Sequence, residues 1–125
     1  MAEKKCSCSL SELRVVACSG GSNVGQIANR AAVSLAEEKV AGFFCLAGIG
    51  AHIKGMVESG KKADLIISID GCPVQCAAKT MQQAEIEPAI QIIVTDLGIE
   101  KSHDLAVDEK ICAKVVEKVK EELAA

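Results

Sequence analysis

The stretch DLIISID, residues 64–70, and the GCPVQC that follows it, residues 71–76, decide the fold. A continuous aliphatic run ends here in an acid, a glycine and a cysteine. A strand that is apolar on both faces is typical of a parallel sheet covered by helices on both sides. Apolar residues then recur at helical spacing, at Val74, Ala77, Ala78, Met81 and Ala84. Residues 64–84 therefore predict a buried strand followed by a helix.

The same succession of strand and helix occurs four times along the chain. The other runs expected to form strands are LRVVAC (13–18), FFCLAG (43–48) and IQIIVTD (90–96). Helical spacing follows each of them, at Ile27 to Ala36, at Ile49 to Val57 up to Gly60, and at Val107 to Leu123. This order predicts a three-layer α/β/α domain with a four-stranded, mostly parallel open sheet, of the Rossmann or flavodoxin-like type. Residues 1–11 are expected to be a flexible tail, and residues 12–125 a single domain.

Composition and charge exclude several classes of function. The formal charge is −3 and there are two Phe but no Tyr or Trp among 125 residues. A basic surface and stacking aromatic side chains are therefore absent, so we expect no nucleic-acid partner. No apolar stretch approaches the roughly 20 residues that span a bilayer, and the start lacks the apolar segment of a secretory signal. The sequence predicts a cytoplasmic protein without a membrane partner and leaves protein partners and oligomeric state open.

Seven cysteines are the most informative feature of the composition. In the cytosol they are expected to bind metal, act in catalysis or pack, and not to form structural disulfides. Cys18 and Cys45 end the first and second predicted strands, Cys72 follows the third, and Cys76 lies one helical turn further on. Carboxyl ends of parallel strands share the edge at which open α/β folds bind ligands. These four thiols are therefore predicted to converge.

Four thiolates form a complete ligand set for zinc, so we expect a zinc site made of Cys18, Cys45, Cys72 and Cys76. Pro73 suits the first position of a helix, which would place Cys72 near its N-cap, where the helix dipole favours a thiolate. Asp70 is expected to support a ligand by hydrogen bonding or to be an extra ligand. His103, in the long loop 97–106, is a remote candidate ligand.

The remaining cysteines have simpler interpretations. Any single cysteine, Cys45 included, is more often packed than a ligand. Cys112 lies beside the apolar stripe of the last helix and is expected in the core. Cys6 and Cys8 belong to the predicted tail, where their role stays open.

Other functions remain open at this point. A thiol-based redox or sulfur-transfer enzyme would use Cys72 as nucleophile and Cys76 as resolving thiol. An iron–sulfur cluster would use the same four thiolates. CSGGSNVGQ (18–26) lacks the Lys and Ser/Thr of a phosphate-binding loop, although Ser22 suits a helix N-cap. Whether a metal would be structural, stored, transferred or catalytic is not decided by the residues.

Four segments carry a resemblance to a known family: CSGGSNVGQIANRAA, CLAGIGAHIKG, IDGCPVQCAAKT and VTDLGIEKSHD, in this order. They resemble the DGC domain family, named for the Asp-Gly-Cys found here as Asp70-Gly71-Cys72. The resemblance covers roughly residues 12–124 and implies zinc binding by four cysteines. The matching positions are Cys18, Cys45, Cys72 and Cys76. It implies nothing for Cys6 and Cys8, which precede the matched segments.

Overall fold

A four-stranded parallel sheet forms the centre of the computed structural model, which describes residues 12–125. Its strands are β1 (Leu13–Ala17), β2 (Gly42–Phe43), β3 (Leu65–Asp70) and β4 (Ile90–Ile93). They lie in the order β2-β1-β3-β4 and every neighbouring pair is parallel. The predicted α/β class and the parallel sheet are confirmed. The predicted tail, with Cys6 and Cys8, lies outside the described residues.

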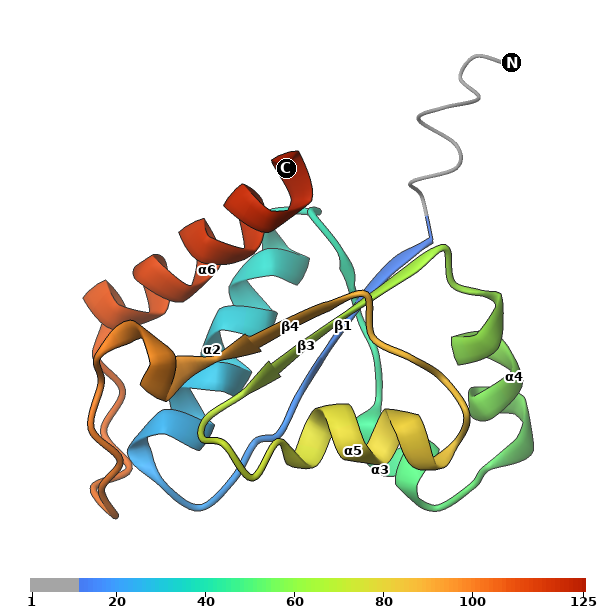
Figure 1. The fold of residues 1–125 in the computed structure, drawn as a ribbon, viewed down its shortest axis with the longest axis horizontal. Coiled ribbons are helices and arrows are strands. Elements are labelled where there is room, and N and C mark those ends of the chain that lie inside the picture. The colour runs from blue at the N-terminus through green and yellow to red at the C-terminus, as the bar shows by residue number, and fades with distance from the viewer. Residues whose placement is uncertain (1–11) are drawn as a thin grey trace.

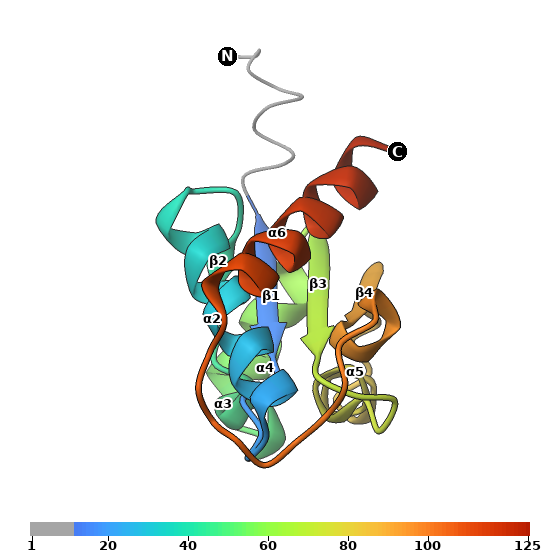
Figure 2. The same ribbon diagram turned by 90° about the vertical axis from the view of Figure 1, so that its left-hand side faces the viewer.

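Helices cover both faces of this sheet (Figures 1 and 2). One layer consists of α2 (Asn23–Glu37) and α6 (Glu109–Ala124), and the other of α3 (Leu46–Gly50) and α5 (Cys76–Gln83), with α4 (Lys54–Lys62) packed next to α3. Val15 packs into the core under α2 and α6, whereas its neighbour Val16 packs into the core under α3 and α5. Because side chains alternate between the two faces and both faces are covered, most residues of β1 and β3 are apolar.

The second strand differs from its prediction. Residues 43–48 were expected to be a strand, but β2 ends at Phe43 and Leu46 already begins α3. A short apolar run does not distinguish a strand from a buried helical turn, which is why the prediction for these residues was wrong. The predicted helix from Ile49 to Gly60 is divided between α3 and α4.

The fourth strand is shorter than expected. It ends at Ile93, and the predicted strand residues after it belong to the 3₁₀ helix η1 (Val94–Leu97).

No helix within residues 12–125 is both long and apolar enough to cross a membrane.

The start of α2 is packed tightly against the loop before it. Ser22 is the N-cap, as predicted, and its hydroxyl accepts a hydrogen bond from the amide of Gly25 at 3.1 Å. A Cβ added at Gly25 would lie 2.7 Å from both the backbone nitrogen and the carbonyl oxygen of Gly20. Only glycine therefore permits this close approach of loop and helix.

We predict that Gly25→Ala lowers the free energy of unfolding by about 1–3 kcal/mol, because backbone atoms must shift to admit the methyl group. Gly55→Ala is the matched control, since Gly55 also lies in the first turn of a helix and a Cβ there would meet nothing within 4 Å. The control should be neutral or stabilising by up to about 1 kcal/mol. Urea unfolding of both variants measures this, and equal effects would contradict the packing argument.

Candidate functional site

The topology singles out one point at the carboxyl edge of the sheet. From β1 the chain passes to β2 on one side and then returns to β3 on the other side of β1. In open α/β folds, the crevice outside such a reversal of strand order is where ligands bind. Cys18 directly follows β1 and Cys72 follows β3 by two residues, so the two cysteines flank the crevice.

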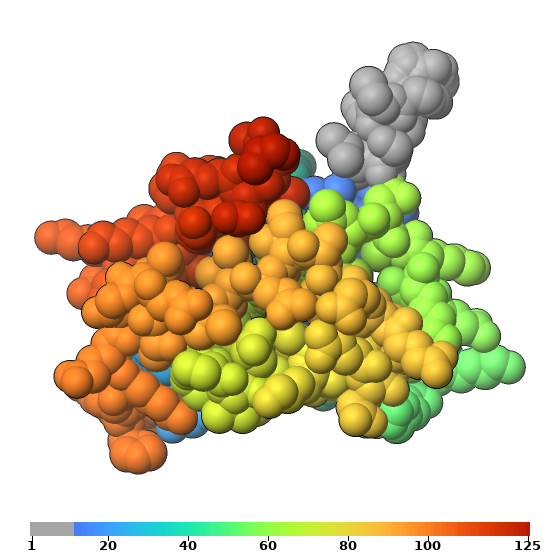
Figure 3. Space-filling view, viewed as in Figure 1, coloured from blue at the N-terminus to red at the C-terminus, as the bar shows by residue number. Residues whose placement is uncertain are grey.

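A pocket of about 300 Å³ opens at this point, and we call it the cysteine pocket. Three predicted site cysteines line it: Cys18, Cys72 and Cys76. The rest of its wall is formed by Gly20, Gly21, Ser22, Gly25, Gly71, Val74, Lys101 and His103. The segments that follow β3 and β4 lie side by side on the surface here (Figure 3). Three of the four predicted cysteines, and His103, therefore lie on the wall of one pocket.

Cys18 is half-buried and packs against both hydrophobic cores of the domain. Its Sγ accepts a hydrogen bond from the amide of Gly71 at 3.3 Å. Burial raises the pKa of the Cys18 thiol above its usual value, against hydrogen bonds from the amides of Gly20 and Gly71, and the negative charges of Asp70 and Cys76 raise it further. Two amides thus face a sulfur whose burial favours the protonated thiol.

Asp70 ties the end of β3 to the start of α5. Asp70 is 1% exposed, and its two carboxylate oxygens accept hydrogen bonds from the amides of Ala77, at 2.6 Å, and Ala78, at 3.1 Å. These amides belong to the first turn of α5, and the amides of a first turn have no acceptor within their own helix. The carboxylate therefore fixes α5, and with it Cys76, relative to the sheet.

The segment between Cys72 and Cys76 is a turn, and the prediction that a helix begins at Pro73 was wrong. α5 begins at Cys76, and its N-cap Gln75 has left-handed backbone angles, φ 56° and ψ 51°. The amide of Gln75 donates to the carbonyl of Cys72 at 3.1 Å, which closes a turn with Pro73 at its second position. Cys72 is thus not at the helix N-cap, yet both cysteines line the pocket.

Cys45 has a different place. It is exposed and forms the N-cap of α3, where its Sγ accepts a hydrogen bond from the amide of Gly48 at 3.3 Å. It is not among the residues that line the cysteine pocket. Cys112 is buried against α2, as expected for a core residue. No cysteine in residues 12–125 forms a disulfide.

The segment after η1 is fastened across the start of α2 by Asn23. The Asn23 amide group donates to the carbonyl of Glu100 at 2.9 Å and accepts from the amide of Ser102 at 2.6 Å. The backbone amide of Asn23 also donates to the Ser102 carbonyl at 3.0 Å. We call residues 98–104 the strap. Within the strap, Lys101 and His103 flank Ser102, and both line the cysteine pocket.

Lys101 brings a positive charge to the thiols. Its Nζ lies 3.6 Å from the Sγ of Cys72, a hydrogen-bonding distance for sulfur. Sequence analysis identified neither Lys101 nor Asn23. Their roles depend on contacts between segments far apart in the chain, and no local pattern of residues indicates them.

The donor set fits a thiophilic metal by its chemistry, because three sulfur ligands and one imidazole line a common pocket. Within the described part of the chain, however, no three His, Cys, Asp or Glu side chains already form a metal-binding group. Metal binding would therefore require the lining side chains to come closer together than they are in this structure.

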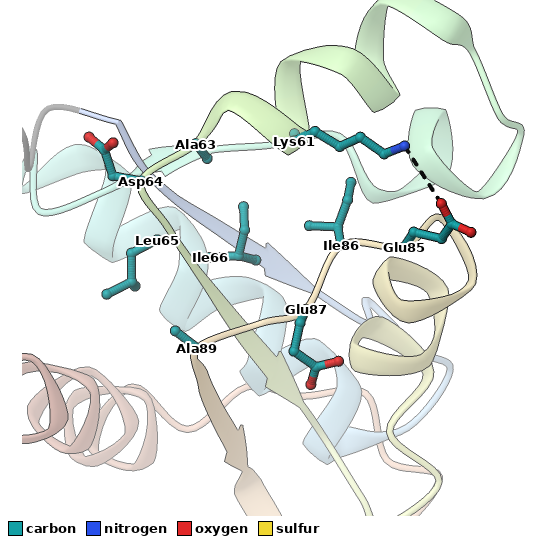
Figure 4. A pocket seen from close by; sticks show the side chains of 10 residues that line it. Lys61, Ala63, Asp64, Leu65, Ile66, Glu85, Ile86, Glu87 and Ala89 are labelled. Atoms are coloured by element: carbon teal, nitrogen blue, oxygen red, sulfur yellow. Dashed lines mark ion pairs between the residues drawn. The ribbon is translucent and has the colours of Figure 1, made fainter.

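A second cavity of about 360 Å³ lies at the opposite edge of the sheet, between the end of α4 and the starts of β3 and β4 (Figure 4). An ion pair between Lys61 Nζ and the Glu85 carboxylate, 4.0 Å apart, lies beside it, and Ile66 and Ile86 form its apolar wall. Its charged side chains are exposed and it contains no thiol. It therefore offers none of the chemistry found in the cysteine pocket.

Comparison with known proteins shows the family of the chain. A model of the DGC domain matches residues 14–119. The chain belongs to the DGC domain family. The anaerobic and virulence modulator AnvM of Pseudomonas aeruginosa is 33% identical to it over 89 residues, which cover 71% of this chain and 68% of AnvM. No solved structure gives a significant match. Asp70, Gly71 and Cys72, the family's eponymous residues, all lie at the cysteine pocket or directly behind it.

We predict that Asp70→Asn lowers the free energy of unfolding by about 1–3 kcal/mol, because an amide can replace only one of the two buried acceptors. Asp64→Asn, directly before the start of the same strand, is the control. Asp64 is exposed, so its substitution should change stability by less than about 0.5 kcal/mol. Urea denaturation of the two variants tests this, and equal stability losses would rule out the capping role.

Wild type and the Asp70→Asn variant together also test how the free energy of unfolding depends on pH. Burial raises the pKa of Asp70, and the amides of Ala77 and Ala78 and the charge of Lys79 offset this only in part. In the unfolded chain this carboxyl ionises at about pH 4, whereas in the folded chain it ionises at a higher pH. Between these two pKa values, the folded chain binds more protons than the unfolded chain. This group's contribution to stability therefore falls as pH rises through that interval. The stability advantage of wild type over Asp70→Asn should narrow there, and widening would contradict the pKa direction.

Proposed function

We propose that this protein binds a thiophilic metal ion, zinc foremost, in the cysteine pocket. The observation that carries the proposal is the position of three thiols on one pocket at the topological switch point of the sheet. Thiolates select soft and borderline metals such as zinc, whereas magnesium and calcium prefer oxygen ligands. A packing role would not account for three half-buried or exposed cysteines facing one cavity.

The residues around Cys18 support this proposal electrostatically. When bound, the metal would supply the positive charge that keeps the thiols deprotonated. Burial, together with the charges of Asp70 and Cys76, raises the pKa of the Cys18 thiol, and a bound cation would lower it. The amides of Gly20 and Gly71 are already directed at its sulfur and would donate to the thiolate.

We assign the site a structural, storage or transfer role in the cytoplasm. The described cysteines are all free, as expected in a reducing compartment. The similar protein AnvM is named an anaerobic and virulence modulator. For this chain we propose a binding role, with the metal ion as its partner and with no nucleic acid or membrane involved.

One contact favours a second candidate function, thiol–disulfide exchange. A lysine ammonium beside a sulfur, such as Lys101 beside Cys72, is typical of nucleophilic cysteines. The Cys72 thiolate would attack a small-molecule disulfide, releasing one thiolate and forming a mixed disulfide. Cys76 would then attack the Cys72 sulfur, lose its proton to solvent and release the second thiol. The protein would end with a Cys72–Cys76 disulfide and the substrate would be reduced to two thiols.

Elemental analysis and a visible absorption spectrum of protein purified without oxygen test the proposal. We predict about one zinc per chain and a colourless solution. Cys72→Ser should lose most of the metal, because it removes a ligand. Cys112→Ala is the matched control: it also removes one thiol, but from a core position outside the pocket, so its metal content should equal that of wild type.

Two other outcomes would replace the proposal. Iron with visible charge-transfer bands would assign the same thiolates to an iron–sulfur cluster. Metal-free protein with Cys72 and Cys76 joined in a disulfide would establish the thiol-exchange function.

A further inference from the structure

We infer that the fourth protein ligand of the proposed metal site is His103, and that Cys45 is not a ligand. This inference rests on the proposed function and departs from the four-cysteine set that the family resemblance implies. It assigns the site as Cys18, Cys72, Cys76 and His103, a combination of three thiolates and one imidazole that zinc accepts in structural sites.

Cys45 is already engaged elsewhere. Its Sγ accepts a hydrogen bond from the Gly48 amide, one of the first amides of α3 that lack an acceptor within the helix. The cysteine pocket is lined by three other cysteines and does not include Cys45. Moving this sulfur to the pocket would leave the Gly48 amide without its partner, and Gly48 is buried.

His103, in contrast, is held on the pocket wall by the strap. Asn23 makes three hydrogen bonds with the backbone of Glu100 and Ser102. Two of them involve Ser102, one with its N–H group and one with its carbonyl group. The residue next to Ser102 is thereby kept on the pocket while its exposed side chain stays free to turn. A fixed backbone lowers the entropy that a ligand loses on binding metal.

The charge of the pocket also favours an imidazole over a fourth thiolate. Zinc with three thiolates and a neutral imidazole keeps one excess negative charge, and a fourth thiolate would add another. Lys101 is the lysine among the lining residues, with its ammonium 3.6 Å from the Cys72 sulfur. One ammonium balances the site with three thiolates and leaves the four-thiolate site uncompensated in a partly buried position.

Zinc titration against a chromophoric chelator tests the inference on the whole chain. We expect His103→Ala to weaken zinc binding more than about tenfold, and Cys45→Ser to change it less than about twofold. The matched control is His52→Ala, which removes the other histidine, an exposed residue outside the pocket. Asn23→Ala should also weaken binding, because it releases the strap without removing a ligand.

Cobalt supplies a readout that loss of folding would not imitate. In the cobalt-loaded protein, the sulfur-to-metal charge-transfer absorption per bound ion counts the thiolate ligands. We expect it to be unchanged in Cys45→Ser and His103→Ala and lower by about a third in Cys72→Ser, given three thiolate ligands. Circular dichroism confirms that each variant is folded.

The outcomes separate this inference from the proposed function. If wild type binds zinc and Cys45→Ser loses both affinity and charge-transfer intensity while His103→Ala does not, the four-cysteine site is correct and the inference is wrong. If neither variant differs from wild type, the inference is also wrong, while the three-cysteine metal site stands. If wild type binds neither zinc nor cobalt, the proposed function itself has failed.

Discussion

The buried carboxylate of Asp70 is the interaction on which the site depends. It ends β3 and accepts hydrogen bonds from two amides of α5, so one side chain joins the last residue of a strand to the first turn of the following helix. Without it, the helix terminus would be buried with unsatisfied donors. The positions of Cys72 and Cys76 both follow from this connection. Cys72 lies in the segment 71–75 between the strand and the helix, and Cys76 begins the helix.

Two segments distant in sequence complete the site around this connection. The loop after β1 presents Cys18 and packs against α2 so closely that glycine is required at Gly25. The strap presents Lys101 and His103 and is fastened to α2 by Asn23. The start of α2 is therefore the common support of both segments. Each brings a different chemistry, a thiol from one and cationic or imidazole nitrogen from the other.

The fold and most of the site could be predicted because long aliphatic runs such as residues 64–70 leave few alternatives. Short segments failed for an identifiable reason: residues 43–48 suit a strand by composition, but Cys45 caps a helix there. The left-handed Gln75 delays α5 to Cys76, and no local pattern reveals this. Contacts such as Asn23 with the strap depend on tertiary structure and cannot be deduced from spacing.

The closed segment 71–75 also limits how the two sulfurs can approach each other. Gly71 lies against α2, where an added Cβ would come within 2.7 Å of the Gly25 nitrogen, and Asp70 fixes the other end through α5. With the backbone held at both ends, the sulfur–sulfur separation changes through staggered χ1 rotamers, in steps and not continuously. A pair held in this way would present its two sulfurs at a few fixed separations, and a hinge in this segment would remove that restriction.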